Sequence, residues 1–105
     1  MIELLTKLIA TPSFSRDEGA TADIIEQVLR DAGADVERFG NNVVAWGVGA
    51  RQAVPPPAIL LNSHHDTVQP GAGWTLDPFV PVVEDGKIIG LGSNDAGGAL
   101  VMMLT

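Results

Sequence analysis

The chain has 105 residues, a formal net charge of -7 and no cysteine. The acidic balance argues against nucleic acid or an anionic membrane as a partner, and the lack of cysteine excludes a disulfide framework and any cysteine-ligated metal. No basic segment precedes an apolar one, and no apolar run approaches the ~20 residues of a membrane span, so we expect a cytoplasmic protein.

Two helices are predicted at the start of the chain. Apolar residues recur at helical spacing over residues 2–9, and Thr11-Pro12 ends this helix because the residue before a proline avoids the helical region. Ser15-Arg16-Asp17-Glu18 has the form of a capping box, and Gly33 stands where a left-handed C-cap is favoured. A second helix is therefore expected between them, with one apolar face on the core.

Two hairpins are predicted further along. Residues 35–46 alternate as paired strands around Gly40-Asn41-Asn42, and residues 80–91 do so across Asp85-Gly86, both turns being rich in residues that tolerate positive φ. Between the hairpins, a glycine- and proline-containing connector is expected over residues 47–57. The run 58–62 is apolar on both faces, which predicts a central strand covered by helices on both sides.

The predicted central strand runs into Ser63-His64-His65-Asp66. On an extended chain, the side chains of His64 and Asp66 share one face while His65 points away. A metal-bound imidazole usually donates its other ring N–H to a carboxylate, so this pair is typical of a metal ligand and its orienter. The alternative interpretation is the start of a solvated loop.

A second carboxylate lies about thirty residues further on, in Gly90-Leu91-Gly92-Ser93-Asn94-Asp95, where the last helix is expected to begin. A plain helix N-cap is the alternative role of Asp95. With Gly73-Trp74-Thr75-Leu76-Asp77-Pro78-Phe79 between them, the two segments resemble the H-x-D, W-x-x-D-P-F and G-x-G-x-x-D motifs of one enzyme family. These are the co-catalytic zinc hydrolases that include acetylornithine deacetylase, succinyl-diaminopimelate desuccinylase, aminoacylase and carboxypeptidase G.

The resemblance implies an α/β fold, a three-layer sandwich around a mixed sheet, as in the N-terminal half of a zinc-exopeptidase-like catalytic domain. It implies two zinc ions, with cobalt as a substitute, that serve to hydrolyse an N-acyl amino acid. His64 would ligate one metal, Asp95 would bridge both, and Asp66 would be the catalytic residue that orients His64. Residues 62–68 look closest to acetylornithine deacetylase, whereas Ala96-Gly97-Gly98 departs from the Met-Lys-Gly of many members and leaves the substrate open.

We expect residues 1–105 to be the N-terminal portion of the catalytic domain. The apolar run 100–105 has no capping glycine or polar tail, and family members are several times longer. The rest of the catalytic domain, the lid and dimerisation domain, the general base and the remaining ligands would follow Thr105. The full-length enzyme is expected to be a homodimer and this piece alone inactive; a dipeptidase or carboxypeptidase of the same family, or a non-catalytic α/β fragment, are the alternatives.

Other candidate sites are weaker. A dinucleotide fingerprint is rejected because Asp95 stands where its third glycine belongs, and Ser63 beside His64 lacks a nucleophile elbow. His65 is expected to be a structural or loop-facing histidine. Trp74 and Asp77 are expected to brace the long loop 67–79, with substrate contact as the lesser alternative.

Overall fold

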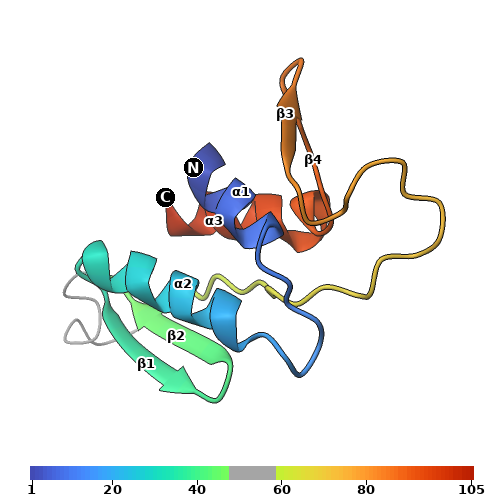
Figure 1. The fold of residues 1–105 in the computed structure, drawn as a ribbon. Coiled ribbons are helices and arrows are strands. Elements are labelled where there is room, and N and C mark those ends of the chain that lie inside the picture. Colours follow the sequence, from blue (N-terminus) through green and yellow to red (C-terminus); the bar gives the residue numbers. More distant parts are fainter. Residues whose placement is uncertain (48–58) are drawn as a thin grey trace.

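The computed structural model describes residues 1–47 and 59–105, which form three helices and two antiparallel two-stranded sheets (Figure 1). In chain order the elements are α1 Ile2–Ile9, α2 Gly19–Asp31, β1 Asp35–Phe39, β2 Asn42–Trp46, β3 Val82–Glu84, β4 Lys87–Ile89, the irregular turn η1 Ser93–Gly97 and α3 Gly98–Leu104. The expected mixed sheet is not found within the described ranges, since both sheets there are antiparallel pairs. None of the described helices is both long and apolar enough to cross a membrane.

The core lies where α1, α2 and α3 meet. Apolar residues three and four positions apart give α1 one buried face, and this face packs beside α3 in the middle of the molecule (Figure 1). The buried cluster consists of Leu5, Leu8, Ile9, Ile25, Leu100 and Val101. The short last helix is thus held by the first one, although they stand at opposite ends of the chain.

Helix α2 covers the β1–β2 hairpin (Figure 1). Its end is confirmed at Gly33, which has a φ of 81° and is followed by an N–H···O bond from Ala34 back to Leu29 at 3.0 Å. The first hairpin is also confirmed, with Asp35 opposite Trp46 at one end of the pairing.

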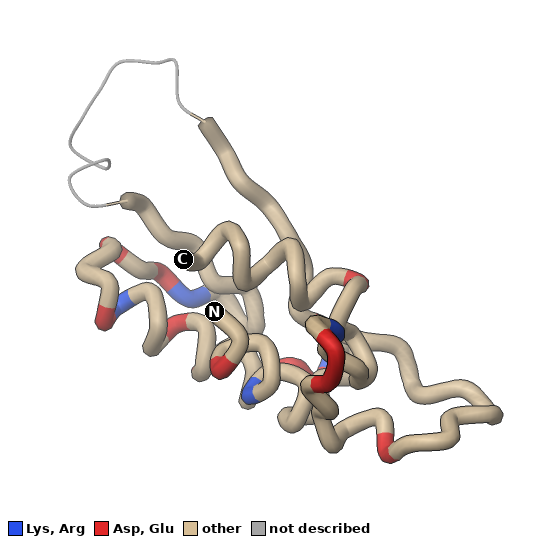
Figure 2. Tube along the Cα trace, turned by 90° about the horizontal axis from the view of Figure 1, so that it is seen from above, with Lys and Arg blue, Asp and Glu red and all other residues tan. Residues whose placement is uncertain are grey.

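Acidic residues outnumber basic ones and are spread along the trace (Figure 2).

The capping box predicted for α2 is wrong. The N-cap position is occupied by Glu18 and has no side-chain cap bond, and the Ser15 hydroxyl instead donates to the carboxylate of Asp66. The chain turns at Arg16, whose φ is 78°, and its N–H donates to the Glu18 carboxylate. This left-handed residue redirects Ser15 away from the helix end and toward the segment that carries the histidines.

The second hairpin is shorter than predicted, and the last helix begins later. Strands β3 and β4 pair across Asp85 and Gly86, whose φ values of 48° and 73° are those of the expected turn. Helix α3 begins at Gly98, with Gly97 as its N-cap, because Asp95 has an extended backbone with φ -120° and ψ 97°. The interpretation of Asp95 as the cap of this helix is therefore wrong.

The apolar run predicted as a central strand is extended but unpaired within the described residues. Ile59 is 90% exposed and Leu60 is 86% exposed. The side chains of this run therefore face water, and helices do not cover them on both sides as expected. It forms one wall of a groove of about 390 Å³ that α2, β2 and α3 complete. Ala58 and the expected connector at 48–57 lie outside the described residues.

Candidate metal centre

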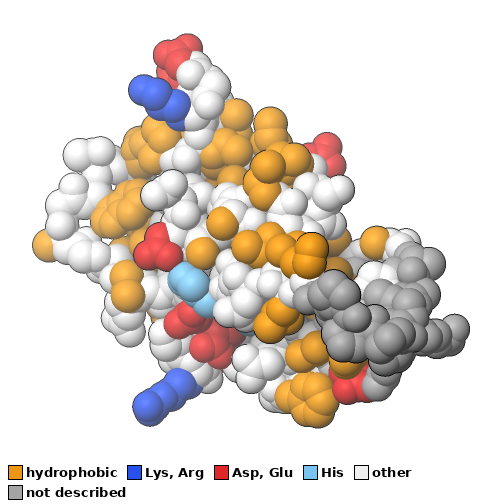
Figure 3. Space-filling model, turned by 180° about the vertical axis from the view of Figure 1, so that it is seen from behind, with side chains coloured by type: hydrophobic (Ala, Val, Ile, Leu, Met, Phe, Trp, Pro, Cys, Tyr) orange, Lys and Arg blue, Asp and Glu red, His pale blue; other side chains and the backbone are white. Residues whose placement is uncertain are grey.

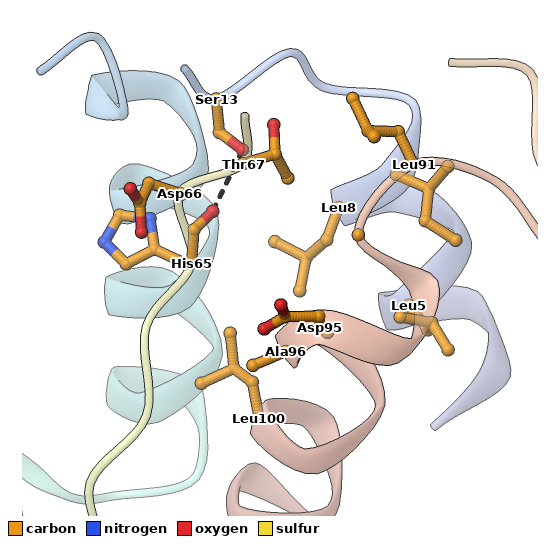
Figure 4. A pocket seen from close by; sticks show the side chains of 13 residues that line it. Leu5, Leu8, Ser13, His65, Asp66, Thr67, Leu91, Asp95, Ala96 and Leu100 are labelled. Atoms are coloured by element: carbon orange, nitrogen blue, oxygen red, sulfur yellow. Dashed lines mark hydrogen bonds between the residues drawn. The ribbon is translucent and has the colours of Figure 1, made fainter. Parts of the chain in front are cut away.

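The histidine segment is held in place by the residues just before α2. The Thr67 N–H donates to the Ser13 carbonyl at 2.7 Å, and Phe14 and Thr67 form a parallel bridge. The Ser13 hydroxyl, on a residue that is only 3% exposed, donates to the His65 carbonyl at 2.9 Å (Figure 4). Two distant stretches of chain are thus fastened together where the polar side chains begin.

His64 lies between two carboxylates. Its Nδ1 atom is 3.1 Å from Asp66 Oδ1, and its Nε2 atom is 3.0 Å from Asp95 Oδ1. The side chains of His64, Asp66 and Asp95 are 52%, 35% and 88% exposed. On the face shown in Figure 3, histidine atoms are visible at the surface with acidic side chains on either side. All three residues singled out from the sequence are therefore brought together.

Glycines allow Asp95 to reach this position. Gly92 has a φ of 76°, which turns the chain after β4, and a Cβ on Gly97 would lie 2.6 Å from the Gly92 carbonyl oxygen and 2.8 Å from Leu5 Cδ1. The turn η1 is therefore drawn tightly against α1. Figure 4 shows Asp95 facing the segment of His65 and Thr67 across a small cavity of about 20 Å³ whose lining includes Leu5, Leu8 and Leu100.

Hydrogen bonds shift the pKa values of His64 and Asp66 away from their ordinary values. Burial lowers the pKa of His64, but hydrogen bonds to the Asp66 carbonyl and the Asp95 carboxylate outweigh it and leave this pKa above its ordinary value. The pKa of Asp66 is lowered, first by the Ser15 hydroxyl and then by the neighbouring His64. Asp66 is therefore held as a carboxylate, the form that orients an imidazole best.

The donor set suits zinc. Imidazole nitrogen and carboxylate oxygen are both zinc ligands, and two such atoms about 2.0–2.2 Å from a tetrahedral ion lie ~3.4 Å apart. His64 Nε2 and Asp95 Oδ1, at 3.0 Å, need only a small separation to fit. Within residues 1–47 and 59–105 there is no group of three or more His, Cys, Asp or Glu side chains able to hold a metal ion. The described chain offers a pair of ligands and an orienting carboxylate.

His65 points the other way, toward α2. Its Nε2 atom lies 3.0 Å from the Asn41 carbonyl oxygen, so this nitrogen carries the proton, and its Nδ1 atom lies 2.9 Å from Thr21 Oγ1. The ring therefore ties the histidine segment to the helix and the first hairpin. This is a structural position, which is one of the two expected from the sequence.

The other sequence candidates lie in the long loop. Asp77 accepts a hydrogen bond from the Phe79 N–H at 2.9 Å, which is a turn contact, and Phe79 packs edge-on against Phe14. Trp74 lines a different hollow, with Leu76 and Ile89. Sequence reasoning missed Ser15 as part of the site, because its local pattern indicates a helix cap and gives no sign of a partner 51 residues away.

An imidazole set between carboxylates at the end of an extended segment is an arrangement that metal-dependent hydrolases use. Residues 60–105 match the family model described as Peptidase family M20/M25/M40. The chain is 36% identical over 104 residues to a protein of Sphingopyxis alaskensis named succinyl-diaminopimelate desuccinylase, covering 94% of this chain and 28% of the relative. Relatives with the same name in Anaplasma marginale and Alkalilimnicola ehrlichii are 30% and 33% identical, covering 94% and 99% of this chain and 27% and 28% of themselves.

Over residues 60–105 the chain is thus similar to peptidase family M20/M25/M40, in agreement with the resemblance of its motifs. The chain spans about 28% of the length of the Sphingopyxis relative. The expected likeness to acetylornithine deacetylase in particular is not supported, because the relatives named above are desuccinylases. The short polar motif 62–68 was too small a basis for choosing among members of one family.

Proposed function

We propose that this chain is the N-terminal part of a metal-dependent hydrolase that removes the acyl group of an N-acyl amino acid, with an N-succinyl amino acid as its substrate. The observation that carries the proposal is His64, whose two ring nitrogens face Asp66 and Asp95 at 3.1 and 3.0 Å. The succinyl group is suggested by the relatives, which are named succinyl-diaminopimelate desuccinylase.

In this proposal His64 and Asp95 would be metal ligands, and Asp95 would be the carboxylate shared by the two ions. Asp66 would accept the Nδ1 proton of His64, so that Nε2, which lies 3.0 Å from Asp95 Oδ1, could exchange its hydrogen bond to Asp95 for a bond to the metal through its lone pair. Two zinc ions, or cobalt in their place, would polarise the scissile carbonyl and lower the pKa of bound water toward ~7. The exposure of Asp95, at 88% of its side chain, leaves its second oxygen free to approach a second ion.

The complete fold is part of the same proposal. We infer that the extended run 59–62 becomes a central strand of a three-layer α/β sandwich when the rest of the catalytic domain is present. This inference is supported by the exposed side chains of Ile59, Leu60 and Leu61, which lie beside an apolar groove. A folded protein normally covers an apolar surface of this kind. A homodimer and a cytoplasmic location rest on the family resemblance and the acidic composition.

The test uses the full-length protein, stripped of metal with a chelator and reloaded with zinc. Hydrolysis of N-succinyl-diaminopimelate, N-acetylornithine and a dipeptide is then compared. We expect zinc-dependent turnover of the succinyl substrate, its loss in Asp95→Asn, and its retention in Glu84→Gln, a matched loss of one acidic charge on β3. Turnover of the dipeptide alone would favour the peptidase alternative, and no turnover of any amide would support a non-catalytic protein.

A further inference from the structure

The residues between α1 and α2 support the candidate metal centre through hydrogen bonds, although none of them is a proposed ligand. Ser13 fixes the backbone of this stretch against the histidine segment through two hydrogen bonds, one from its hydroxyl to the His65 carbonyl and one to its own carbonyl from the Thr67 N–H. Ser13 is 3% exposed, so these bonds are shielded from water. This pairing brings the side chain of Ser15 to Asp66.

The Ser15 hydroxyl donates to Asp66 Oδ2, while Asp66 Oδ1 faces His64 Nδ1 at 3.1 Å. Each carboxylate oxygen of Asp66 therefore has its own partner, on opposite sides of the group. A carboxylate held at one oxygen only can rotate about its Cβ–Cγ bond, because that torsion is broad. Held at both oxygens, its plane is fixed, and so is the direction in which it receives the imidazole proton.

The turn that presents Ser15 is itself braced. Arg16 adopts a left-handed φ of 78°, and its N–H donates to Glu18 Oε1. The other oxygen of Glu18 accepts a bond from Asn41 Nδ2 at 2.7 Å, which links the turn to the first hairpin. Two hydrogen bonds of the Glu18 side chain thus hold the turn that carries Ser15, and a residue that orients another needs such support.

We propose that Ser15 is a positioning residue that acts on His64 through Asp66, a role that rests on the proposed function of His64 as a metal ligand. The chain of contacts runs from the Ser15 hydroxyl to Asp66 Oδ2, from Asp66 Oδ1 to His64 Nδ1, and from His64 Nε2 to Asp95. The hydroxyl of Ser15 donates to Asp66 and not to His64 or Asp95, the proposed ligands. Its effect is on the orientation and basicity of the imidazole.

The test measures zinc affinity of the full-length protein by competition with a chromophoric chelator, together with the visible spectrum of the cobalt form. A direct orienter of a metal-bound histidine is worth about 10–100-fold in affinity, and Ser15 lies one step further out, so we expect Ser15→Ala to weaken zinc binding by about 3–10-fold. Ser15→Thr keeps the hydroxyl and should restore the affinity. Thr11→Ala, which removes a hydroxyl bonded to the Lys7 carbonyl, is the matched control.

A double-mutant cycle separates positioning from folding. If Ser15 acts through Asp66, then Ser15→Ala made on top of Asp66→Ala should cause no further loss of zinc affinity. A loss of equal size in both backgrounds, or unchanged affinity in Ser15→Ala alone, would overturn the role of Ser15. Failure of the wild-type protein to bind zinc through His64 and Asp95, seen as no effect of Asp95→Asn on affinity, would instead refute the proposed function.

Discussion

The Nδ1 atom of His65 lies 2.9 Å from the hydroxyl oxygen of Thr21, a residue of α2 that is 1% exposed and stands 44 positions earlier in the chain. The neighbouring His64 is half exposed and faces the two carboxylates. Adjacent histidines thus serve two different purposes, one joining elements of the fold and the other forming the candidate site.

The first prediction compares these two histidines. His65→Ala removes both ring bonds, to Thr21 and to Asn41, and should lower the free energy of unfolding by about 1–3 kcal/mol, because partly buried polar groups lose their partners. His64→Ala should change stability little, since its ring is exposed, while weakening zinc binding. Urea unfolding of the metal-free full-length variants makes the comparison. Equal stability of the two variants would contradict the structural role of His65.

The second prediction concerns Asp66. Asp66→Asn keeps a side chain of similar shape but loses the charge that receives the His64 proton, so zinc affinity should fall by about 10–100-fold. Asp31→Asn, at the end of α2 and hydrogen-bonded to Gln27, is the matched control. Competition titration with a chromophoric chelator measures both. An Asp66→Asn variant with wild-type affinity would show that His64 needs no carboxylate orienter.

The third prediction tests the close packing of η1 on α1. A Cβ at Gly97 would lie 2.6 Å from the Gly92 carbonyl oxygen and 2.8 Å from Leu5 Cδ1, so Gly97→Ala should destabilise by about 1–3 kcal/mol. The backbone of Gly97 is helical, with φ -56°, so alanine is otherwise acceptable there. Gly71→Ala, where a Cβ would meet nothing within 4 Å, should be close to neutral. Thermal melts of both variants decide the matter.

The fourth prediction concerns acid. The Arg16 N–H and then the Asn41 amide hold the pKa of Glu18 below its ordinary value of 4.5. A lowered pKa in the folded state contributes stability that is present above the ordinary value and is lost as the pH falls through the lowered one. Stability should therefore decline more steeply below about pH 4.5 in the wild type than in Glu18→Gln. If the melting temperatures of the two proteins changed in parallel with pH, the hydrogen bonds of the Glu18 carboxylate would not stabilise the turn that carries Ser15.

The fifth prediction concerns residues 1–105 produced alone. Ile59, Leu60 and Leu61 are 90%, 86% and 64% exposed, and such a run of apolar side chains favours association. Sedimentation velocity should show oligomers that grow with concentration, and Leu60→Lys should reduce them. With only His64 and Asp95 as ligands, this piece should also bind zinc weakly. A monomer with tight stoichiometric zinc binding would refute both expectations.

Local sequence determined the elements whose signals are contained in a few neighbouring residues. The end of α2 at Gly33 and the hairpin turns at Gly40 and at Asp85-Gly86 were predictable, because glycine and short polar residues accept positive φ at little cost. The helical face of α1 followed from its apolar spacing. The H-x-D and G-x-G-x-x-D motifs also indicated that the polar residues His64, Asp66 and Asp95 belong together.

Only the tertiary structure decided the contacts between distant segments. Ser15 has a clear local reason to cap α2, yet it donates to Asp66, because the left-handed turn at Arg16 and the pairing of Ser13 with the histidine segment outweigh a single cap bond. The start of α3 at Gly98 likewise depends on how η1 packs against Leu5. Local propensities are worth about 1 kcal/mol each, so a few shielded long-range hydrogen bonds and a close-packed contact suffice to override them.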